Sequence, residues 1–175
     1  YLHAASGINF PDEIAGMPRT STYDYEVKNP GLGVSLKYEL RGRLTADVYV
    51  YTAGIKSVPG DARAPLMAQL RTQTEREIMA FAESNKATAQ KTESTLLTVQ
   101  TGAGAVAVLF DAFVLTVASG KTESYVWLWP ACGHFMKIRA TWRLGAPMDE
   151  AALKAFTEAV VRLAAESGCA NPQVA

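Results

Sequence analysis

The sequence has few of the residues that build metal centres. It contains 2 cysteines and 2 histidines among 175 residues, and neither type occurs at the close spacing of a C-x-x-C or H-x-x-x-H motif. Two cysteines alone cannot complete a tetrahedral zinc site. We therefore expect no metal site and no cofactor, and we expect burial of the 49% hydrophobic residues to provide the core.

An excess of charge of one sign is also lacking. Lysine plus arginine equals aspartate plus glutamate, at 17 each, and no stretch collects five like charges. Nucleic acids and anionic membrane surfaces attract basic patches. Neither is therefore an expected partner, and an unidentified small ligand or envelope protein remains the expected one.

No hydrophobic run is long enough to cross a membrane as a helix. The longest, residues 103–118, falls short of the roughly 20 residues required and contains Asp111, so we expect a strand there. The chain begins at Tyr1 rather than at methionine and carries no recognisable signal peptide. This beginning fits a processed export product or a trimmed chain.

Residues 125–144 predict two strands joined by a tight connection at residues 130–133. The second strand alternates, with Met136, Ile138, Ala140, Trp142 and Leu144 on one face and Lys137, Arg139, Thr141 and Arg143 on the other. A two-residue period with one buried and one wet face is typical of an antiparallel sheet. We expect further strands over residues 20–27, 34–40, 44–51, 94–101 and 105–117.

Two helices are predicted from apolar residues at helical spacing. The first begins at Asp61 or near Pro65 and ends at Ser84, and the second runs from Asp149 to Ser167. The order strands, helix, strands, helix indicates an α+β fold, with one antiparallel sheet whose buried face is covered by both helices. We expect one domain over residues 1–175, with an irregular lead-in over residues 1–19 and a tail over residues 170–175.

Several stretches resemble known proteins. The segments G-I-N-F-P-D-E-I-A-G-M-P-R, Y-D-Y-E-V-K-N-P-G-L-G-V-S-L-K-Y-E, D-V-Y-V-Y-T-A-G and F-M-K-I-R-A-T-W resemble a group of uncharacterised exported bacterial proteins. The order of elements is similar to the Mog1/PsbP-like fold, whose members are mostly binding or assembly factors. The resemblance implies periplasmic or secreted localisation and transfers no active site.

Cys132 and Cys169 form an even pair, as a periplasmic protein with one structural disulfide would carry. A bridge between them is favoured over two unbridged cysteines. The run Cys132-Gly133-His134 also places a thiol beside an imidazole, but catalytic cysteine and histidine normally come from separate segments. We therefore single out no catalytic residue.

One face of the predicted sheet carries a candidate ligand site formed by Tyr49, Tyr51, Lys137 and Arg139. If the strand 44–51 lies near the last strand, cations and phenols share one surface that suits an anionic or aromatic group. The alternative is an ordinary solvated face on which the tyrosines pair across strands. Asp111 is expected on the wet face or opposite Lys137 or Arg139.

The sequence therefore favours a non-catalytic, exported binding or accessory domain for a small ligand or partner protein. Two other classes stay open. One is a hydrolase-type enzyme with dispersed catalytic residues, which a cleft holding several strongly shifted pKa values would favour. The other is a structural or assembly protein of the cell envelope, which a contiguous exposed apolar patch would favour.

Overall fold

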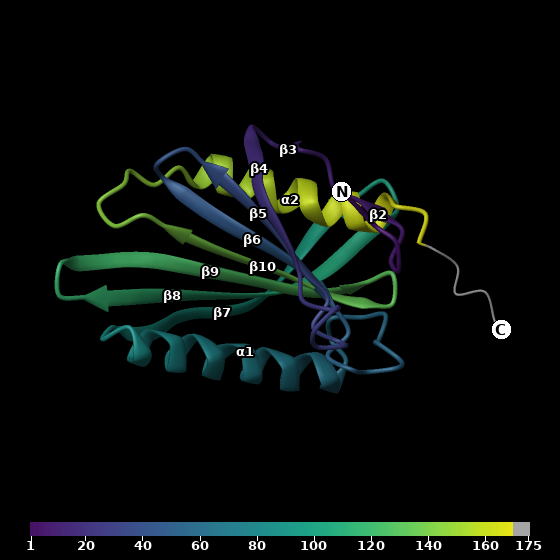
Figure 1. The fold of residues 1–175 in the computed structure, drawn as a ribbon, viewed down its shortest axis with the longest axis horizontal. Helices are drawn as coiled ribbons and strands as arrows, with labels where there is room; N and C mark the ends of the chain where they lie inside the picture. Colours follow the sequence, from purple (N-terminus) through teal and green to yellow (C-terminus); the bar gives the residue numbers. More distant parts are fainter. Residues whose placement is uncertain (170–175) are drawn as a thin grey trace.

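An eight-stranded antiparallel sheet forms the centre of the computed structural model, which describes residues 1–169 (Figure 1). The strand order is β3-β4-β5-β6-β10-β9-β8-β7. The strands are β3 (Glu13–Ile14), β4 (Met17–Asp24), β5 (Val34–Leu40), β6 (Leu44–Tyr51), β7 (Thr88–Thr101), β8 (Gly104–Val117), β9 (Gly120–Ala131) and β10 (His134–Trp142). The α+β class is confirmed. The expectation of a single sheet is wrong, because β1 (Leu2–His3) and β2 (Ile8–Asn9) form a second, two-stranded sheet.

The first 19 residues are more regular than expected. They contain β1, β2 and β3 and the start of β4. The N-terminal amine donates to the Phe10 carbonyl at 2.7 Å, and the Phe10 amide donates to the Tyr1 carbonyl at 2.7 Å. Phe10 and Met17 are fully buried in the core cluster that also contains α2. Burial of these apolar side chains holds the segment in place although its prolines and glycines predict irregular backbone.

The two helices lie on opposite faces of the large sheet, whereas we expected both on one face. Helix α2 (Glu150–Glu166) packs with the face that carries Met136, Ile138 and Trp142, and runs behind β4 and β5 in Figure 1. Helix α1 (Pro65–Ser84) packs with the face that carries Phe135, and lies along the lower edge of the view. The sheet is therefore the middle layer of three.

The strands at the centre of these layers are hydrophobic on both faces. In β9, Trp127 and Trp129 belong to the α2-side core, while Val126 and Leu128 belong to clusters on the α1 side. Continuous apolar runs, rather than alternation, are typical of strands covered on both faces. The apolar run at residues 103–118, which contains β8, likewise indicates a strand covered on both faces. Helix α1 covers one of these faces, and α2 covers the other.

The predicted and observed strand ends agree best for β5 and β6, whose sequences alternate strictly between apolar and polar residues. β5 and β6 begin and end at the expected residues, and Leu44, Ala46, Val48 and Val50 are all fully buried. Trp142 is 2% exposed, which confirms the predicted face of β10. Leu144 lies beyond the end of β10 and is 42% exposed, so the alternation does not extend to it.

An ion pair with Arg71 joins α1 to the sheet at Asp111, which we expected on the wet face or opposite Lys137 or Arg139; Asp111 is instead buried and pairs with neither of them. Asp111 is 4% exposed and accepts from Arg71 Nε at 2.9 Å and Nη2 at 2.7 Å. Arg71 Nη2 also donates to the Phe110 carbonyl at 2.6 Å, and Ser94 Oγ donates to Asp111 at 2.7 Å. The carboxylate is therefore buried with its charge compensated by the helix.

Cys132 and Cys169 lie at disulfide distance, with their sulfur atoms 2.11 Å apart. Cys132 occupies the connection between β9 and β10, and Cys169 follows the end of α2. Among residues 1–169, no helix is both long and apolar enough to cross a membrane. The expected tail at residues 170–175 lies outside the described residues.

Candidate functional site

The four predicted ligand-site residues share one sheet face, but that face is not simply solvated. Lys137 lies directly opposite Tyr49 on the neighbouring strand, and Arg139 lies opposite Asp47. The side chain of Lys137 is only 16% exposed, because α1 covers this part of the sheet. Arg139 stacks instead on the ring of Phe81 from α1, 5.1 Å from its centroid.

Three of the four residues line a cavity of about 220 Å³ between α1 and the sheet, here called the α1 cavity. Lys137 Nζ lies 4.8 Å from the ring centroid of Tyr49 and 5.4 Å from that of Tyr51. Arg139 does not line this cavity. The other lining residues are Tyr25, Leu32, Ala53, Leu70, Gln73, Thr74 and Glu77. The predicted cation and phenols are therefore brought together, without the arginine.

Burial shifts the titration of the groups in the α1 cavity. It lowers the pKa of the Lys137 ammonium, which the nearby Arg139 lowers further and the Glu77 carboxylate, at 3.7 Å, raises. It raises the pKa of Tyr49 to about 12 and also raises the pKa of Tyr51. Both phenols therefore remain protonated at neutral pH.

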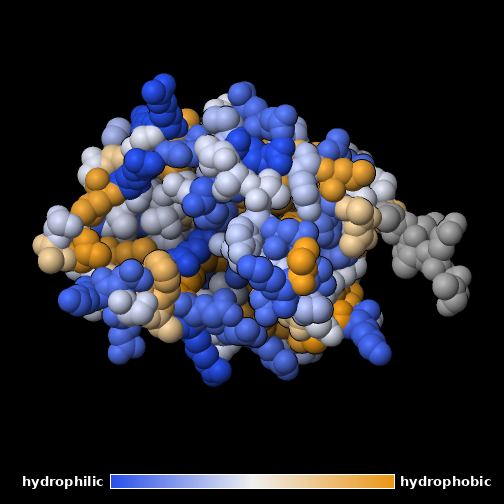
Figure 2. Space-filling view, in the orientation of Figure 1, coloured by the Kyte–Doolittle hydropathy of each residue, from blue (hydrophilic) through white to orange (hydrophobic). Residues whose placement is uncertain are grey.

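The surface seen in the orientation of Figure 1 is predominantly hydrophilic. Figure 2 shows hydrophobic residues in several separate patches, and a hollow above the position of α1 where hydrophilic and hydrophobic residues lie side by side. No single hydrophobic patch covers the visible face. This face therefore offers small recesses rather than a broad apolar contact area.

The loop after β4 closes one side of the α1 cavity and depends on glycine. A side chain at Gly33, whose φ is +62°, would place its Cβ 1.9 Å from the Val50 carbonyl oxygen. The carboxylate of Glu26 accepts from the Gly31 amide at 2.9 Å and the Gly33 amide at 2.8 Å. These backbone hydrogen bonds lower the pKa of Glu26. Tyr25 and Leu32, both in this loop, are thereby positioned at the cavity.

Glu26→Gln is expected to lower the free energy of unfolding at neutral pH by up to about 1 kcal/mol, since it replaces a charged carboxylate with a neutral amide that keeps one acceptor oxygen. The folded-state pKa of Glu26 is depressed, so its contribution is present above the unfolded pKa and lost as pH falls through the folded pKa. Urea unfolding should therefore show a difference at pH 7 that disappears in strong acid. Glu83→Gln, which removes another exposed carboxylate, is the control. A difference that persists unchanged at pH 2 would contradict the proposed hydrogen bonding.

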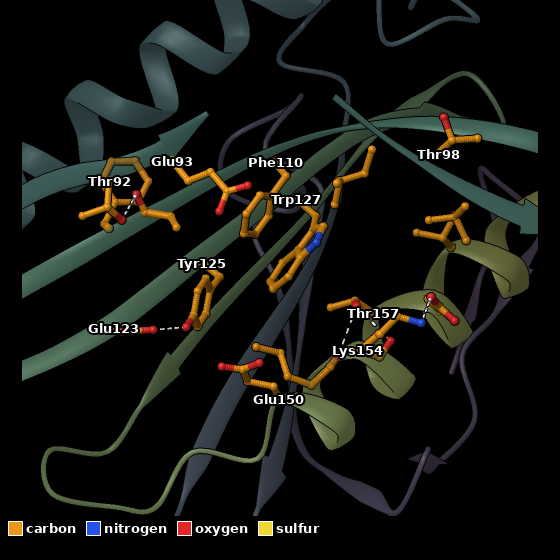
Figure 3. Close-up of a pocket in the computed structure, with 17 residues that line it drawn as sticks. Thr92, Glu93, Thr98, Phe110, Glu123, Tyr125, Trp127, Glu150, Lys154 and Thr157 are labelled. Carbon is orange, nitrogen blue, oxygen red and sulfur yellow. Dashed lines mark hydrogen bonds and ion pairs between the residues drawn. The ribbon is translucent and has the colours of Figure 1, made fainter. Parts of the chain in front are cut away.

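A larger cavity lies on the opposite face, between α2 and the strands β7, β8 and β9. It has a volume of about 540 Å³ and is here called the α2 cavity. Figure 3 shows the aromatic side chains of Phe110, Tyr125 and Trp127 gathered at its centre, with Glu93 on one side and Glu150 on the other. The remaining lining residues are Thr92, Leu97, Thr98, Val99, Ala112, Phe113, Glu123, Leu153, Lys154, Thr157, Glu158 and Val161.

The two-residue period of a strand and the three- to four-residue spacing of a helix explain why these side chains face the same cavity. Glu123, Tyr125 and Trp127 alternate along β9 and so project from one face of the strand. On α2, the lining residues Glu150, Leu153, Lys154, Thr157, Glu158 and Val161 follow helical three- and four-residue spacing. The cavity is therefore enclosed by regular elements, which hold its side chains more rigidly than loops would.

Three rings form a continuous aromatic wall in the α2 cavity. The ring centroid of Phe110 lies 5.2 Å from that of Trp127 and 6.1 Å from that of Tyr125, and those of Tyr125 and Trp127 are 5.9 Å apart. Trp127 is 8% exposed, whereas Phe110 and Tyr125 are half-buried. The wall is thus anchored in the core at one end and open at the other.

Carboxylates surround this wall. The cavity is lined by Glu93, Glu123, Glu150 and Glu158, and by one cation, Lys154. Glu158 lies 2.6 Å from Lys154 Nζ and 2.9 Å from Nη2 of Arg162, which is outside the lining, so two cations share this carboxylate. The four negative charges and one positive charge of the lining sum to −3, and Arg162 beside Glu158 offsets one further negative charge.

Tyr125 shows the effect of that charge. Its hydroxyl donates to the Glu123 carboxylate. Burial, this hydrogen bond and the charges of Glu123 and Glu150 all raise the pKa of Tyr125. In contrast, the hydrogen bond from Lys154 lowers the pKa of Glu158. Tyr125 therefore stays neutral and Glu158 stays ionised across the physiological pH range.

Sequence reasoning missed the α2 cavity. The sequence predicts a strand that contains Tyr125 and Trp127 and a helix that contains Leu153, but it does not indicate a cavity between them. The usable signal was the alternation Glu123, Tyr125, Trp127, which places an acidic residue in line with two aromatic ones. It could not show that α2 stands away from the sheet at this point, since the separation of two elements is a tertiary property.

The cysteine and histidine motif forms no catalytic pair. Cys132 Sγ is directed to Cys169, and His134 Nδ1 lies 2.7 Å from the Cys132 carbonyl oxygen rather than beside a thiol. His134 instead contacts His3, with ring centroids 5.1 Å apart. Within residues 1–169, no three histidine, cysteine, aspartate or glutamate side chains converge as metal ligands would.

The comparisons with known proteins place the chain in no family. No protein-family model matches it, and no curated protein matches it. The two cavities and their chemistry therefore carry the functional argument.

Proposed function

We propose that this protein is a non-catalytic binding domain whose small organic ligand occupies the α2 cavity. The observation that carries the proposal is the cavity's aromatic wall of Phe110, Tyr125 and Trp127, enclosed by a helix and three strands. A volume of about 540 Å³ falls within the range of small-molecule sites. Aromatic side chains give a bound molecule a large, rigid apolar contact.

The pKa shifts of Tyr125 and Glu158 support binding rather than acid–base catalysis by these two residues. General acids and bases work best with pKa values near the operating pH. In the α2 cavity, the pKa of Tyr125 is raised and that of Glu158 is lowered, so both shifts lead away from neutrality. Tyr125 therefore remains a hydrogen-bond donor and Glu158 remains charged at neutral pH, and groups with a constant protonation state suit ligand recognition.

The compartment we infer is the periplasm or the extracellular medium. Its support is the pair Cys132 and Cys169 at disulfide distance, because such bonds persist in oxidising compartments. The resemblance to exported bacterial proteins, carried by the segments quoted above, agrees with this assignment. Detection of the protein in a periplasmic or culture-medium fraction of its own organism tests it.

Leu97→Trp is expected to abolish ligand binding, because the bulky ring enters the α2 cavity from its open side. Leu97 lines the cavity and is 37% exposed, so the substitution does not overfill the core. Binding is measured by ¹⁵N NMR titration with a panel of soluble aromatic amines, alcohols and carboxylates, following the indole resonance of Trp127. We expect at least about a tenfold loss of affinity for the compounds that bind the parent.

Leu96→Trp is the matched control. Leu96 is 40% exposed and follows the same strand, but it lies on the opposite face and does not line the cavity. It should bind the panel as the parent does. If no compound shifts the Trp127 resonance in the parent, or if both tryptophan variants bind equally well, the α2 cavity is not the binding site.

A further inference from the structure

The α2 cavity combines an aromatic wall with a negative lining, and this combination selects for one class of ligand. Resting on the proposed function, we infer that the ligand is an organic cation, an amine or quaternary ammonium group attached to an apolar body. The apolar body lies against Phe110 and Trp127, and the cationic group lies between the carboxylates of Glu93 and Glu150.

The aromatic wall favours a cation through its electron distribution. The faces of aromatic rings carry partial negative charge, and Trp and Tyr attract a cation placed within about 6 Å of the ring centroid. In Figure 3 the rings of Tyr125 and Trp127 lie between Glu93 and Glu150. A ligand cation held between Glu93 and Glu150 would therefore lie beside the rings of Tyr125 and Trp127 as well as the two carboxylates.

The charges of the lining favour the same sign of ligand. Among residues 1–169, Lys154 is the only cation in the lining, and Glu158 pairs with it at 2.6 Å and with Arg162, outside the lining, at 2.9 Å. Glu93, Glu123 and Glu150 have no ion-pair partner within residues 1–169. The amino end of α2 contributes a partial positive charge of only about half a unit, which three carboxylates outweigh. An anionic ligand would be repelled.

The hydroxyl of Tyr125 fixes one of these carboxylates in place. By donating to Glu123, it orients that carboxylate beside the aromatic wall and leaves acceptor capacity for a ligand N–H group. The raised pKa of Tyr125 keeps the hydroxyl as a donor. Glu123 is half-buried, so water screens its charge less than it screens those of Glu93 and Glu150 at the exposed rim.

The α1 cavity provides an internal contrast. Its lining also contains aromatic rings, Tyr49 and Tyr51, but the chain's own Lys137 already lies over their faces. In the α2 cavity, no lysine or arginine among residues 1–169 lies over the rings of Phe110, Tyr125 or Trp127. The rings there are thus left to a cation supplied by the ligand.

Three probes of matched shape test the ligand class: 2-phenylethylammonium, 2-phenylethanol and phenylacetate, which are cationic, neutral and anionic. Titration of the parent protein, by NMR at low salt, should give an affinity for the ammonium about tenfold above that for the alcohol. Phenylacetate should bind weakest. Raising the ionic strength should weaken the ammonium complex and leave the alcohol complex unchanged.

The double variant Glu93→Gln/Glu150→Gln removes two rim charges. Its affinity for 2-phenylethylammonium should fall about three- to tenfold, since exposed ion pairs contribute modestly, and its affinity for 2-phenylethanol should be unchanged. Glu13→Gln/Glu83→Gln is the matched control, because both carboxylates are exposed and neither lines the cavity. This control removes the same net charge and should bind all three probes as the parent does.

The outcomes separate the ligand class from the proposed function. If 2-phenylethanol or phenylacetate binds the parent as tightly as the ammonium, and Leu97→Trp abolishes that binding, the cation inference is overturned and the binding function stands. Equal loss of ammonium affinity in both double variants overturns the inference too, because the effect would then be one of overall charge. If none of the probes or panel compounds binds at the α2 cavity, both proposals fail.

Discussion

Arg71→Leu is expected to lower the free energy of unfolding by about 3–5 kcal/mol, because it leaves a buried carboxylate without its cation. Asp111 is 4% exposed, and Arg71 supplies three of its hydrogen bonds, at 2.7 to 3.0 Å. Arg71 Nη2 also bonds the backbone carbonyls of Thr95 and Phe110. The substitution therefore removes the charge partner of Asp111 and, at the same point, the attachment of α1 to β7 and β8. Urea unfolding at pH 7 measures the loss.

Two further variants show whether the unpaired charge causes the effect. Arg71→Leu/Asp111→Leu removes both partners and should recover most of the lost stability, since a hydrophobic pair of similar volume often replaces a buried ion pair without cost. Arg63→Leu removes an exposed arginine, 61% exposed at its side chain, and should change stability by no more than about 0.5 kcal/mol. If the double variant is as unstable as Arg71→Leu, loss of helix packing rather than an unpaired carboxylate explains the result.

Replacing both cysteines by serine is expected to lower the free energy of unfolding by about 4 kcal/mol. A bond between Cys132 and Cys169 closes a loop spanning 37 residues, and chain-entropy arguments give this magnitude for a loop of that length. The bond would restrain the unfolded chain and tie the end of α2 to the connection between β9 and β10. Urea unfolding of the oxidised parent and the double variant measures the difference.

Thiol titration decides whether the bond forms in solution. The denatured, unreduced parent should show no reactive thiol, and full reduction should release two per chain. Reduction should also bring the parent's unfolding midpoint close to that of the serine variant, which serves as the matched reference. Two reactive thiols before reduction would count against the bond and also against an oxidising compartment.

The sequence predicted helices and strands well where a single pattern, such as strict alternation or a proline at a helix start, was clear. Strict alternation located β5 and β6, and turn residues separated them. For α1, the helix begins at Pro65, one of the two predicted starts, and ends at Ser84 as predicted. Phe81 falls at the helical spacing of Leu70 and Ile78, which are buried, yet it is 55% exposed, whereas Met67 and Ala82 are buried.

The faces of the sheet were harder to predict, because a helix covers the side that alternation marked as wet. Lys137 and Arg139 alternate with buried residues as an exposed pair would, yet Lys137 is mostly covered by α1, and Arg139 packs on a ring from that helix. Long cationic side chains can pass along apolar surface while keeping their charged ends near water. Their presence on a strand therefore does not exclude a packed neighbour.

The sequence by itself determined the α+β class, strands β5 and β6, the approximate positions of both helices and a preference for pairing the two cysteines, because each rests on local periodicity or on a choice between very few partners. Only the tertiary structure decided that the helices lie on opposite faces, that Arg71 compensates Asp111 and that α2 leaves a cavity over Tyr125 and Trp127. Those features depend on contacts between residues far apart in the chain. Periodicity states which side of an element is apolar, but it does not state which other element covers that side or how closely.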